Sequence, residues 1–389
     1  MGWRAGLDGP GRTGARPMTT LMRHEIAEQP AVLARTLETL VAPVEAVAGT
    51  FAARGIRTIV TCGRGSSDHV ARYASYLLTI HAGLLVADLT PSIVTAYGAT
   101  PVLPDAALLA ISQSGAAEDI RAVAAAARAE GAPVVAITNA PDAPLLEVAD
   151  HALVTPAGPE RSVPATKTFT AALAAVALLG SVLARHGGGA AHGGGAARGG
   201  SARGGRVTGL DTVDLARLPE AVERVLALEP ELAALGARLK GRDRCAVIGR
   251  GYNRATASEV ALKIQETSYL SAQDYGASDF LHGPVAVVEP GFEVLVIVAP
   301  GPTAATVLTV ATRARELGAR VTVISDGPVD RAAIAAAADA HVHLETGLAE
   351  PLTPIAFAVA GQLVALHLAL AEGRSPDVPR ALRKVTVTR

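Results

Sequence analysis

Runs of apolar residues without polar alternation recur along the chain, each followed by a segment with helical spacing. Residues 108–111 are all apolar, as in a strand that is covered on both faces. Residues 119–128 then resume at helical spacing. Strands that alternate with helices in this way predict an α/β protein in which helices flank a parallel sheet. The polar turn at 112–115 would lie where such a strand passes into a helix.

The same pattern occurs twice, so we expect two domains of one architecture. The segment TIVTCGRGSSDHVARYASYLL is echoed by RCAVIGRGYNRATASEVALKI, and LLAISQSG is echoed by VLVIVAPG. The repeat predicts a tandem α/β chain in which each domain is a three-layer parallel sheet of the flavodoxin or Rossmann type. We place the first domain at 24–185 and the second at 210–372. Ligands bind such sheets beyond the carboxyl ends of the strands, where 112–115 would lie.

Three segments fall outside these domains. We expect residues 1–23 to be a disordered extension and residues 373–389 to be a C-terminal tail. Between the domains, residues 186–209 include HGGGAAHGGGAARGGSARGG, which cannot bury enough apolar surface to offset the entropy of ordering it. We therefore expect a flexible tether there. Its two histidines have no rigid partner ligands, so we predict no metal site.

The composition argues against several classes of binding partner. The chain of 389 residues has a net charge of -1 and 3% aromatic residues, so it lacks the basic field and the stacking surfaces of nucleic-acid binding proteins. We expect no apolar run of membrane-spanning length and no secretory signal. Cys62 and Cys245 lie in predicted core strands, without the spacing of a metal or disulfide framework. A soluble protein of the reducing cytoplasm fits best.

Two serine-bearing turns are the best candidates for a ligand site. The turn at 112–115 follows one predicted strand, and a turn at 65–67 follows an earlier one. The hydroxyls of Ser112 and Ser114 could simply cap the next helix. The alternative is a phosphate cradle, because free N–H groups and the positive dipole end of a helix attract an anion. Both turns open at one end of the sheet, which favours a phosphate site built from Ser66, Ser67, Ser112, Gln113, Ser114 and Gly115.

The first of these turns also resembles a dinucleotide fingerprint. GRGSSD follows a strand, and Asp88 ends the next strand, where a ribose-binding acid could lie. However, Asp68 replaces the third glycine, and the second copy, GRGYNR, has no matching acid. We therefore predict that the protein uses no nicotinamide and no other cofactor.

A candidate acid–base group lies in the second domain. SEVALKIQETSY places Glu259, Lys263 and Glu266 on one face of a predicted helix. These residues could form a ladder of surface ion pairs. Glu266 is near the end of that helix, however, where a carboxylate opposes the helix dipole and needs another reason to be present.

Six ordered motifs together resemble the family with two sugar isomerase (SIS) domains, namely GRGSSDH, ISQSG, PATKTFT, ALKIQETSY, FLHGP and LRKVTVT. That family includes the isomerase half of glutamine–fructose-6-phosphate aminotransferase and the SIS-type glucosamine-6-phosphate deaminases. The resemblance implies that Glu266 moves a proton between C1 and C2 of an open-chain sugar, and that Lys263 stabilises the enolic intermediate. It also implies a homodimer in which His282 opens the sugar ring in the neighbouring subunit's site. Lys384 would assist ring opening or form an imine.

The resemblance further implies a phosphorylated amino sugar as substrate, with no metal. Weaker contacts with that substrate are implied for Val163, Ala165, Lys167 and Arg383.

The resemblance leaves the direction of the reaction open. Synthases of the family take ammonia from glutamine with an N-terminal cysteine, whereas residue 2 here is glycine and neither cysteine lies near the start. We therefore expect a deaminase that converts glucosamine 6-phosphate and water into fructose 6-phosphate and ammonia. The alternatives are the isomerase subunit of a glucosamine-6-phosphate synthase, a galactosamine-6-phosphate deaminase/isomerase, a fructosamine-6-phosphate deglycase and a non-catalytic sugar-phosphate sensor.

Overall fold

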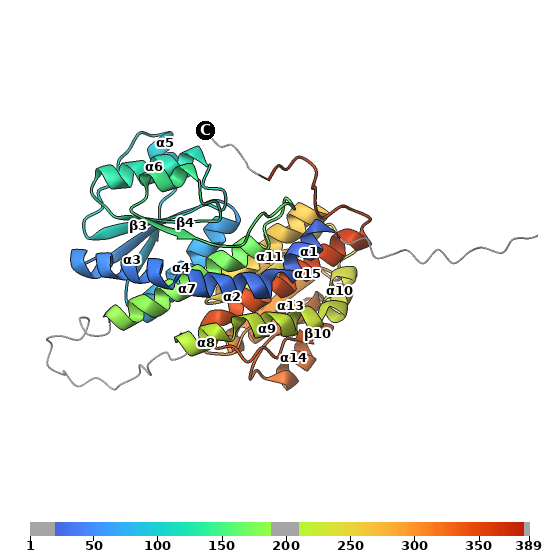
Figure 1. The fold of residues 1–389 in the computed structure, drawn as a ribbon. Coiled ribbons are helices and arrows are strands. Elements are labelled where there is room, and N and C mark those ends of the chain that lie inside the picture. Colours follow the sequence, from blue (N-terminus) through green and yellow to red (C-terminus); the bar gives the residue numbers. More distant parts are fainter. Residues whose placement is uncertain (1–19, 188–209, 385–389) are drawn as a thin grey trace, which may run out of the picture.

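Two five-stranded parallel sheets form the framework of the protein (Figure 1). The computed structural model describes residues 20–187 and 210–384. The first sheet has the strand order β2-β1-β3-β4-β5, and the second has the order β10-β9-β8-β6-β7, which is the same topology read from the opposite edge. The predictions of an α/β fold and of a twofold repeat are confirmed.

The first sheet is built from short strands joined by helical crossovers. Its strands are β1 (Thr58–Cys62), β2 (Leu85–Asp88), β3 (Ala106–Ile111), β4 (Val134–Thr138) and β5 (His151–Val154). The helices of this half are α1 (Leu21–Ala27), α2 (Gln29–Thr39), α3 (Val41–Arg54), α4 (Ser66–Ala82), α5 (Ser92–Thr95), α6 (Glu118–Ala129) and α7 (Lys167–Gly187), with the 3-10 helix η1 (Pro144–Val148).

The second half repeats this arrangement. Its strands are β6 (Arg244–Gly249), β7 (Ser271–Gly276), β8 (Glu293–Val298), β9 (Arg320–Ser325) and β10 (Ala340–His343). Its helices are α8 (Thr212–Ala216), α9 (Leu218–Ala227), α10 (Glu229–Arg238), α11 (Asn253–Ser268), α12 (Ala277–Leu281), α13 (Ala304–Glu316), α14 (Arg331–Ala337) and α15 (Thr353–Ala371), with the 3-10 helices η2 (Pro284–Val287) and η3 (Glu350–Leu352).

The segments predicted to lack structure fall mostly outside the described residues. This holds for residues 1–19 of the expected extension, for 188–209 of the expected tether and for 385–389 of the tail. Helix α1 begins at Leu21, inside the expected extension, and α7 runs to Gly187, inside the expected tether.

The strands lack polar alternation because both faces of each sheet are buried. On β3, Ala107, Leu109 and Ile111 join a large core between the two sheets, while the residues between them join a smaller outer core with α6. The second sheet is divided in the same way, and α12, α13 and α14 cover its outer face.

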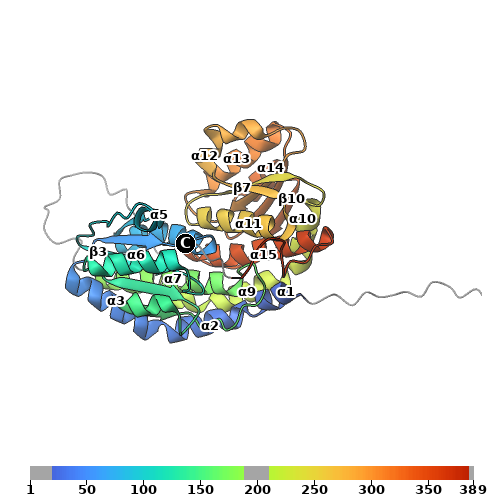
Figure 2. The same ribbon diagram turned by 90° about the horizontal axis from the view of Figure 1, so that it is seen from above.

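A layer of helices between the two sheets makes the halves share one core. Helix α11 packs against α15 and α4, and α7 packs against α4 and α15 (Figure 2). Helices that precede the first sheet also reach the second half, because α2 packs against α9 and α1 packs against α15. The relative position of the two sheets is therefore set by side-chain packing.

The expectation that no apolar stretch reaches membrane-spanning length was wrong. The helical segments Lys167–His186 and Glu350–Ala371 are long and apolar enough to cross a membrane by length and composition. Within the protein, 94% and 83% of their most apolar windows are buried. A helix that packs on every side carries apolar residues all round, so the position of α7 and α15 in the shared core accounts for their composition.

Close packing in the shared core predicts opposite effects for two helical glycines. Gly236 in α10 lies against α15, where an added Cβ would stand 2.6 Å from the main-chain oxygen of Val364. We expect Gly236→Ala to lower the free energy of unfolding by about 1–3 kcal/mol through overpacking. Gly49 in α3 has nothing within 4 Å of that position, so Gly49→Ala should stabilise by up to about 1 kcal/mol through helix propensity. Urea titration measures both changes, and effects of the same sign would contradict this packing.

Candidate functional site

The two serine-bearing turns meet where neighbouring strands of the first sheet send their crossovers to opposite faces. Ser66 and Ser67 begin α4 after β1, and the turn at 112–115 follows β3. These strands are adjacent, yet α4 packs in the shared core and α6 in the outer core. In sheets of this order, such a switch point opens the crevice that binds ligands. Of the predicted phosphate-binding residues, Ser66, Ser67 and Gln113 line one cavity at this point, whereas Ser112, Ser114 and Gly115 do not line it.

The serines of the second turn shape the turn itself. Ser112 Oγ accepts a hydrogen bond from Gly115 N at 3.1 Å, and Ser114 Oγ accepts one from Ala116 N at 3.3 Å. Helix α6 begins later, at Glu118, and no side chain caps it. The interpretation of these serines as helix caps is therefore wrong.

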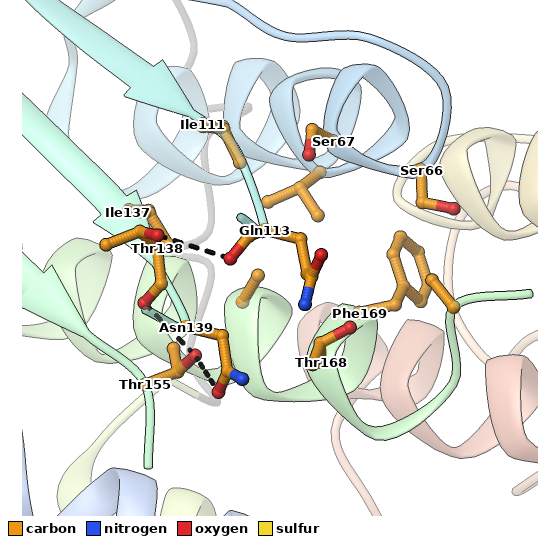
Figure 3. Close-up of a pocket in the computed structure, with 13 residues that line it drawn as sticks. Ser66, Ser67, Ile111, Gln113, Ile137, Thr138, Asn139, Thr155, Thr168 and Phe169 are labelled. Atoms are coloured by element: carbon orange, nitrogen blue, oxygen red, sulfur yellow. Dashed lines mark hydrogen bonds between the residues drawn. The ribbon is translucent and has the colours of Figure 1, made fainter. Parts of the chain in front are cut away.

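A small cavity lined by both polar and apolar side chains lies between these turns and α7 (Figure 3). Its volume is about 30 Å³, which matches a single water molecule. The main-chain oxygen of Gln113 accepts hydrogen bonds from Asn139 N at 2.9 Å and from Thr138 Oγ1 at 3.2 Å, which ties the turn to β4. The polar lining residues are Ser66, Ser67, Gln113, Thr138, Asn139, Thr155 and Thr168. The cavity is only partly enclosed, so a group larger than a water molecule would extend beyond it.

Ser66 links the cavity to the second half of the chain. Its Oγ donates a hydrogen bond to Glu259 Oε1 at 2.9 Å, and His69 Nδ1 lies 2.7 Å from Glu259 Oε2. Burial alone would raise the pKa of Glu259, but the charge of Lys263 and the contacts with His69 and Ser66 hold it below its usual value. Glu259 is therefore an ionised bridge between α11 and α4.

Lys263 lies at the centre of the predicted acid–base group. Its Nζ is 3.4 Å from Glu259 Oε1 and 2.5 Å from Glu266 Oε2. Burial alone would lower the pKa of Lys263, but its attraction to the two carboxylates raises it, so the ammonium group stays charged. The Glu266 side chain is 20% exposed, whereas that of Glu259 is 1% exposed. Glu266 is therefore partly open to solvent, where a ligand could contact it. Glu259 and Lys263 are buried, so the interpretation of these two residues as a surface ladder of ion pairs is wrong.

The predicted C-terminal lysine reaches the cavity through another residue. Lys384 Nζ lies 2.6 Å from Glu160 Oε2, and Thr168 Oγ1 donates to the same oxygen at 2.7 Å. Thr168 and Ala165 both line the cavity. The structure therefore places Lys384 near the predicted phosphate site, with its amine bound to a buried carboxylate.

The remaining predicted residues lie farther from the cavity lining. Lys167 is buried and pairs with Glu28. Val163 N donates to the main-chain oxygen of Asp377 at 2.9 Å. His282 and Arg383 are exposed, and their side chains form no hydrogen bond or ion pair with the described part of the chain.

Sequence reasoning missed three residues that hold this site together. Asn139 follows β4 at the same sheet edge as the two turns, so its position after a strand was a usable signal. Glu160 and His69 gave no local signal, because their partners Lys384 and Glu259 are 224 and 190 residues away in the chain.

Comparison with known proteins agrees with this duplicated architecture. Residues 54–182 and 238–372 each match the SIS domain. The chain belongs to the SIS domain family. It is 34% identical over 379 residues to a glutamine–fructose-6-phosphate aminotransferase of Aeropyrum pernix, covering 94% of this chain and 57% of that one. It is 32% identical over 335 residues to the corresponding protein of Pyrococcus horikoshii, covering 85% and 52%. The chain thus spans a little more than half the length of these relatives.

Solved structures support the same fold. A protein of Silicibacter pomeroyi assigned to the phosphosugar isomerases is 33% identical, with a TM-score of 0.79 over 92% of this chain and 100% of that one. The C-terminal domain of the aminotransferase of Francisella tularensis is 21% identical, with a TM-score of 0.78 over 93% and 99%. A glucosamine-6-phosphate deaminase of Thermotoga maritima is 19% identical, with a TM-score of 0.70 over 95% and 100%. The last two likenesses concern the fold alone.

A carboxylate lies against the equivalent turn of the second SIS domain. The repeat aligns the Ser-Gln-Ser-Gly turn with residues 298–301, which read Val-Ala-Pro-Gly and so lack its hydroxyls and one N–H donor. A Cβ added to Gly301 would stand 2.2 Å from Glu350 Oε2. Burial raises the pKa of Glu350, and its ionised form would repel a phosphate. We call the two serine-bearing turns at 65–67 and 112–115 the polar cradle. It belongs to the first SIS domain.

The described residues offer neither a cluster of metal-ligating groups nor a reactive cysteine. They contain no group of three or more side chains that could hold a metal ion. Burial raises the pKa of Cys62 and of Cys245 to about 12, so both thiols stay protonated and are poor nucleophiles.

The Glu259 bridge predicts a pH-dependent contribution to stability. Because the pKa of Glu259 is lowered on folding, its contribution is present above the usual value of 4.5 and is lost as the pH falls through the folded value. We expect Glu259→Gln to lower the free energy of unfolding at neutral pH by about 3 kcal/mol, since it breaks a buried ion pair.

Denaturant titrations at neutral and acidic pH test this expectation. The difference between wild type and variant should shrink below pH 4.5. Glu220→Gln is the matched control, because Glu220 and Arg224 form a pair with the same spacing on the exposed face of α9. It should change stability little at either pH. A Glu259→Gln effect that persists unchanged in acid would contradict the ionised bridge.

Proposed function

We propose that the chain carries the isomerase activity of the glutamine–fructose-6-phosphate aminotransferases and acts on a phosphorylated amino sugar. One observation carries the proposal. The polar cradle of the first SIS domain is linked to the Glu266–Lys263 pair of the second through the contact between Ser66 and Glu259. The similarity to the aminotransferases supports the choice of substrate class, although the chain spans only about half of those proteins.

The phosphate group would occupy the polar cradle of the first SIS domain. Ser67 lies at the start of α4, and Gln113, in the turn after β3, lines the same cavity, so both can offer polar groups to the phosphate. The Ser66 hydroxyl is already bound to Glu259, so this residue would contribute its main-chain N–H. Helix dipole and N–H donors favour an anion at this position.

Glu266 would transfer the proton between C1 and C2 of the open-chain sugar. The nearby ammonium group of Lys263 would compensate the negative charge that develops on the enolic oxygen. A positioned acid–base residue typically contributes about 10²- to 10⁴-fold to the rate. Because Lys263 is held between two carboxylates, it keeps its charge and its place during this step.

Ring opening would use groups from the edge of the site. Lys384 approaches from the C-terminal tail and would bind the sugar carbonyl or assist its release from the ring. His282 is exposed in the turn after α12, as expected if it serves the site of a second subunit in a homodimer. Val163, Ala165, Lys167 and Arg383 would contribute weaker contacts or support.

A deaminase is the second candidate, and it would use the same site in the opposite direction. The residues of the proton transfer are common to both reactions, so the geometry alone is compatible with each. The fold of the Thermotoga maritima deaminase is shared by this chain. The named aminotransferase relatives favour the synthetic direction as the main proposal.

An assay of both directions tests the proposal. We expect the purified protein to interconvert glucosamine 6-phosphate with fructose 6-phosphate and ammonia, without added metal or nicotinamide. Ammonia release and hexosamine formation are measured separately, with free ammonia or with glutamine as donor, and Glu266→Gln is the inactive control. Turnover that requires a metal or NAD, or turnover of no phosphosugar at all, would overturn the proposed function.

Substrate binding and proton transfer should separate in two variants. Ser112→Ala removes a hydroxyl that orders the cradle, so it should mainly raise KM. Glu266→Gln should lower kcat by about 10²-fold or more while the substrate still binds, because it removes a base that is used only along the reaction path. Solvent deuterium should enter C2 of the glucosamine 6-phosphate that the wild type forms, or C1 of fructose 6-phosphate in the reverse direction, and should fail to do so in Glu266→Gln.

The control for the serine substitution is Ser271→Ala, which changes an exposed serine at the start of β7. It should leave both kinetic constants unchanged. Ordinary turnover by Glu266→Gln, or an unchanged KM in Ser112→Ala, would show that the assigned roles are wrong.

A further inference from the structure

The carboxylate of Glu160 is fully enclosed and has two kinds of partner. Thr166 N and Thr168 N donate to its Oε1 at 2.9 and 3.1 Å, next to the start of α7. Lys384 Nζ binds its Oε2 at 2.6 Å. The side chain of Glu160 is 0% exposed, and that of Lys384 is 24% exposed. Glu160 thus joins the cavity wall to the C-terminal tail, because both of its oxygens bind Thr166 or Thr168 and Oε2 also binds Lys384.

The tail reaches Glu160 along a defined path. The guanidinium groups of Arg374 and Arg380 lie 4.5 and 4.3 Å from the centre of the Tyr269 ring, and Arg380 N donates to Tyr269 Oη at 2.8 Å. Asp377 accepts hydrogen bonds from Leu21 N and Met22 N at the start of α1. These contacts bring the tail to the site, and the bond with Glu160 then decides where the Lys384 amine lies.

The pair also lies within electrostatic reach of the acid–base group. Glu160 is among the carboxylates whose attraction raises the pKa of Lys263, after the larger effects of Glu259 and Glu266. Burial alone would raise the pKa of Glu160, but the charge of Lys384 and the hydrogen bonds around the carboxylate hold it below its usual value. An ionised Glu160 is therefore paired with Lys384 and also attracts the ammonium group of Lys263 in α11.

We propose that Glu160 is a positioning residue, which holds the Lys384 amine at the edge of the cavity where the sugar carbonyl would lie. This inference rests on the proposed function. Glu160 acts through Lys384. Because Glu160 also binds Thr166 and Thr168, it fixes the position of the Lys384 amine relative to the cradle.

A double-mutant cycle on the full chain separates this role from a merely structural one. We expect Glu160→Gln and Lys384→Met each to lower kcat by about 10- to 100-fold, as for loss of a charge-assisted contact, while KM for the phosphosugar changes little. The double variant should be no slower than Lys384→Met, because Glu160 has no effect without its lysine. Additive losses, or wild-type kcat in either single variant, would overturn the proposal.

Glu25→Gln is the matched control for the loop between β5 and α7, which contains Glu160. Glu25 is also buried and accepts a hydrogen bond from Ser162 N at 3.2 Å, but it contacts no lysine in the described residues. It should leave kcat near the wild-type value and combine additively with Lys384→Met. A kcat loss in Glu25→Gln as large as that in Glu160→Gln would show that loop integrity alone explains the effect.

Limited trypsin digestion keeps the inference testable if Glu160→Gln does not fold. Lys384→Met breaks the pair from the tail side and leaves Glu160 in place, so cleavage after Arg380 and Arg383 should become at least about tenfold faster. An unchanged cleavage rate would contradict the pairing. This readout needs no substrate, so it stands even if the wild type converts no phosphosugar, an outcome that would reject the proposed function instead.

Discussion

The buried carboxylate of Glu259 is the constraint on which the site depends. A carboxylate at that depth is tolerated only when charge and hydrogen bonds compensate it, and the partners come from both halves of the chain. Ser66 and His69 approach from α4, and Lys263 from its own helix. The two sheets can therefore not shift relative to each other without exposing an uncompensated charge. Because Lys263 also holds Glu266, the same constraint sets the distance between the cradle and the acid–base group.

Two copies of one fold have acquired different tasks in this protein. The strand order is the same in both sheets, so each has a switch point at which a ligand could bind. In the first SIS domain that position is polar and lined by serine, threonine and asparagine. In the second, the carboxylate of Glu350 lies against Gly301, while the helix after the first strand carries Glu259, Lys263 and Glu266. Under the proposed function, binding and proton transfer are divided between the copies, and their shared core brings the two tasks together.

The tail and the cavity belong to the same arrangement. A volume of about 30 Å³ holds no whole sugar, so under the proposed function the sugar either extends out of this partly enclosed cavity or displaces one of its walls. The wall formed by Thr168 is tied through Glu160 to Lys384, which is also the group proposed to act on the sugar carbonyl. Entry of the sugar and placement of the lysine are therefore coupled physically, because one buried carboxylate holds both.

The local features of this protein could be predicted from its sequence because each depends on residues that are only a few positions apart. The buried strands, the turns at their carboxyl ends, the duplication and the common face of Glu259, Lys263 and Glu266 all follow from spacing within a few residues. The structure contradicts three interpretations: the helix caps at 112–115, the surface ladder on α11 and the absence of apolar stretches of membrane-spanning length. The last two concern burial. Burial depends on what packs against an element, and pairs such as Ser66 with Glu259 or Glu160 with Lys384 join residues 193 and 224 positions apart. Only the tertiary structure decides such contacts, because nothing in the neighbouring sequence of either partner records the other.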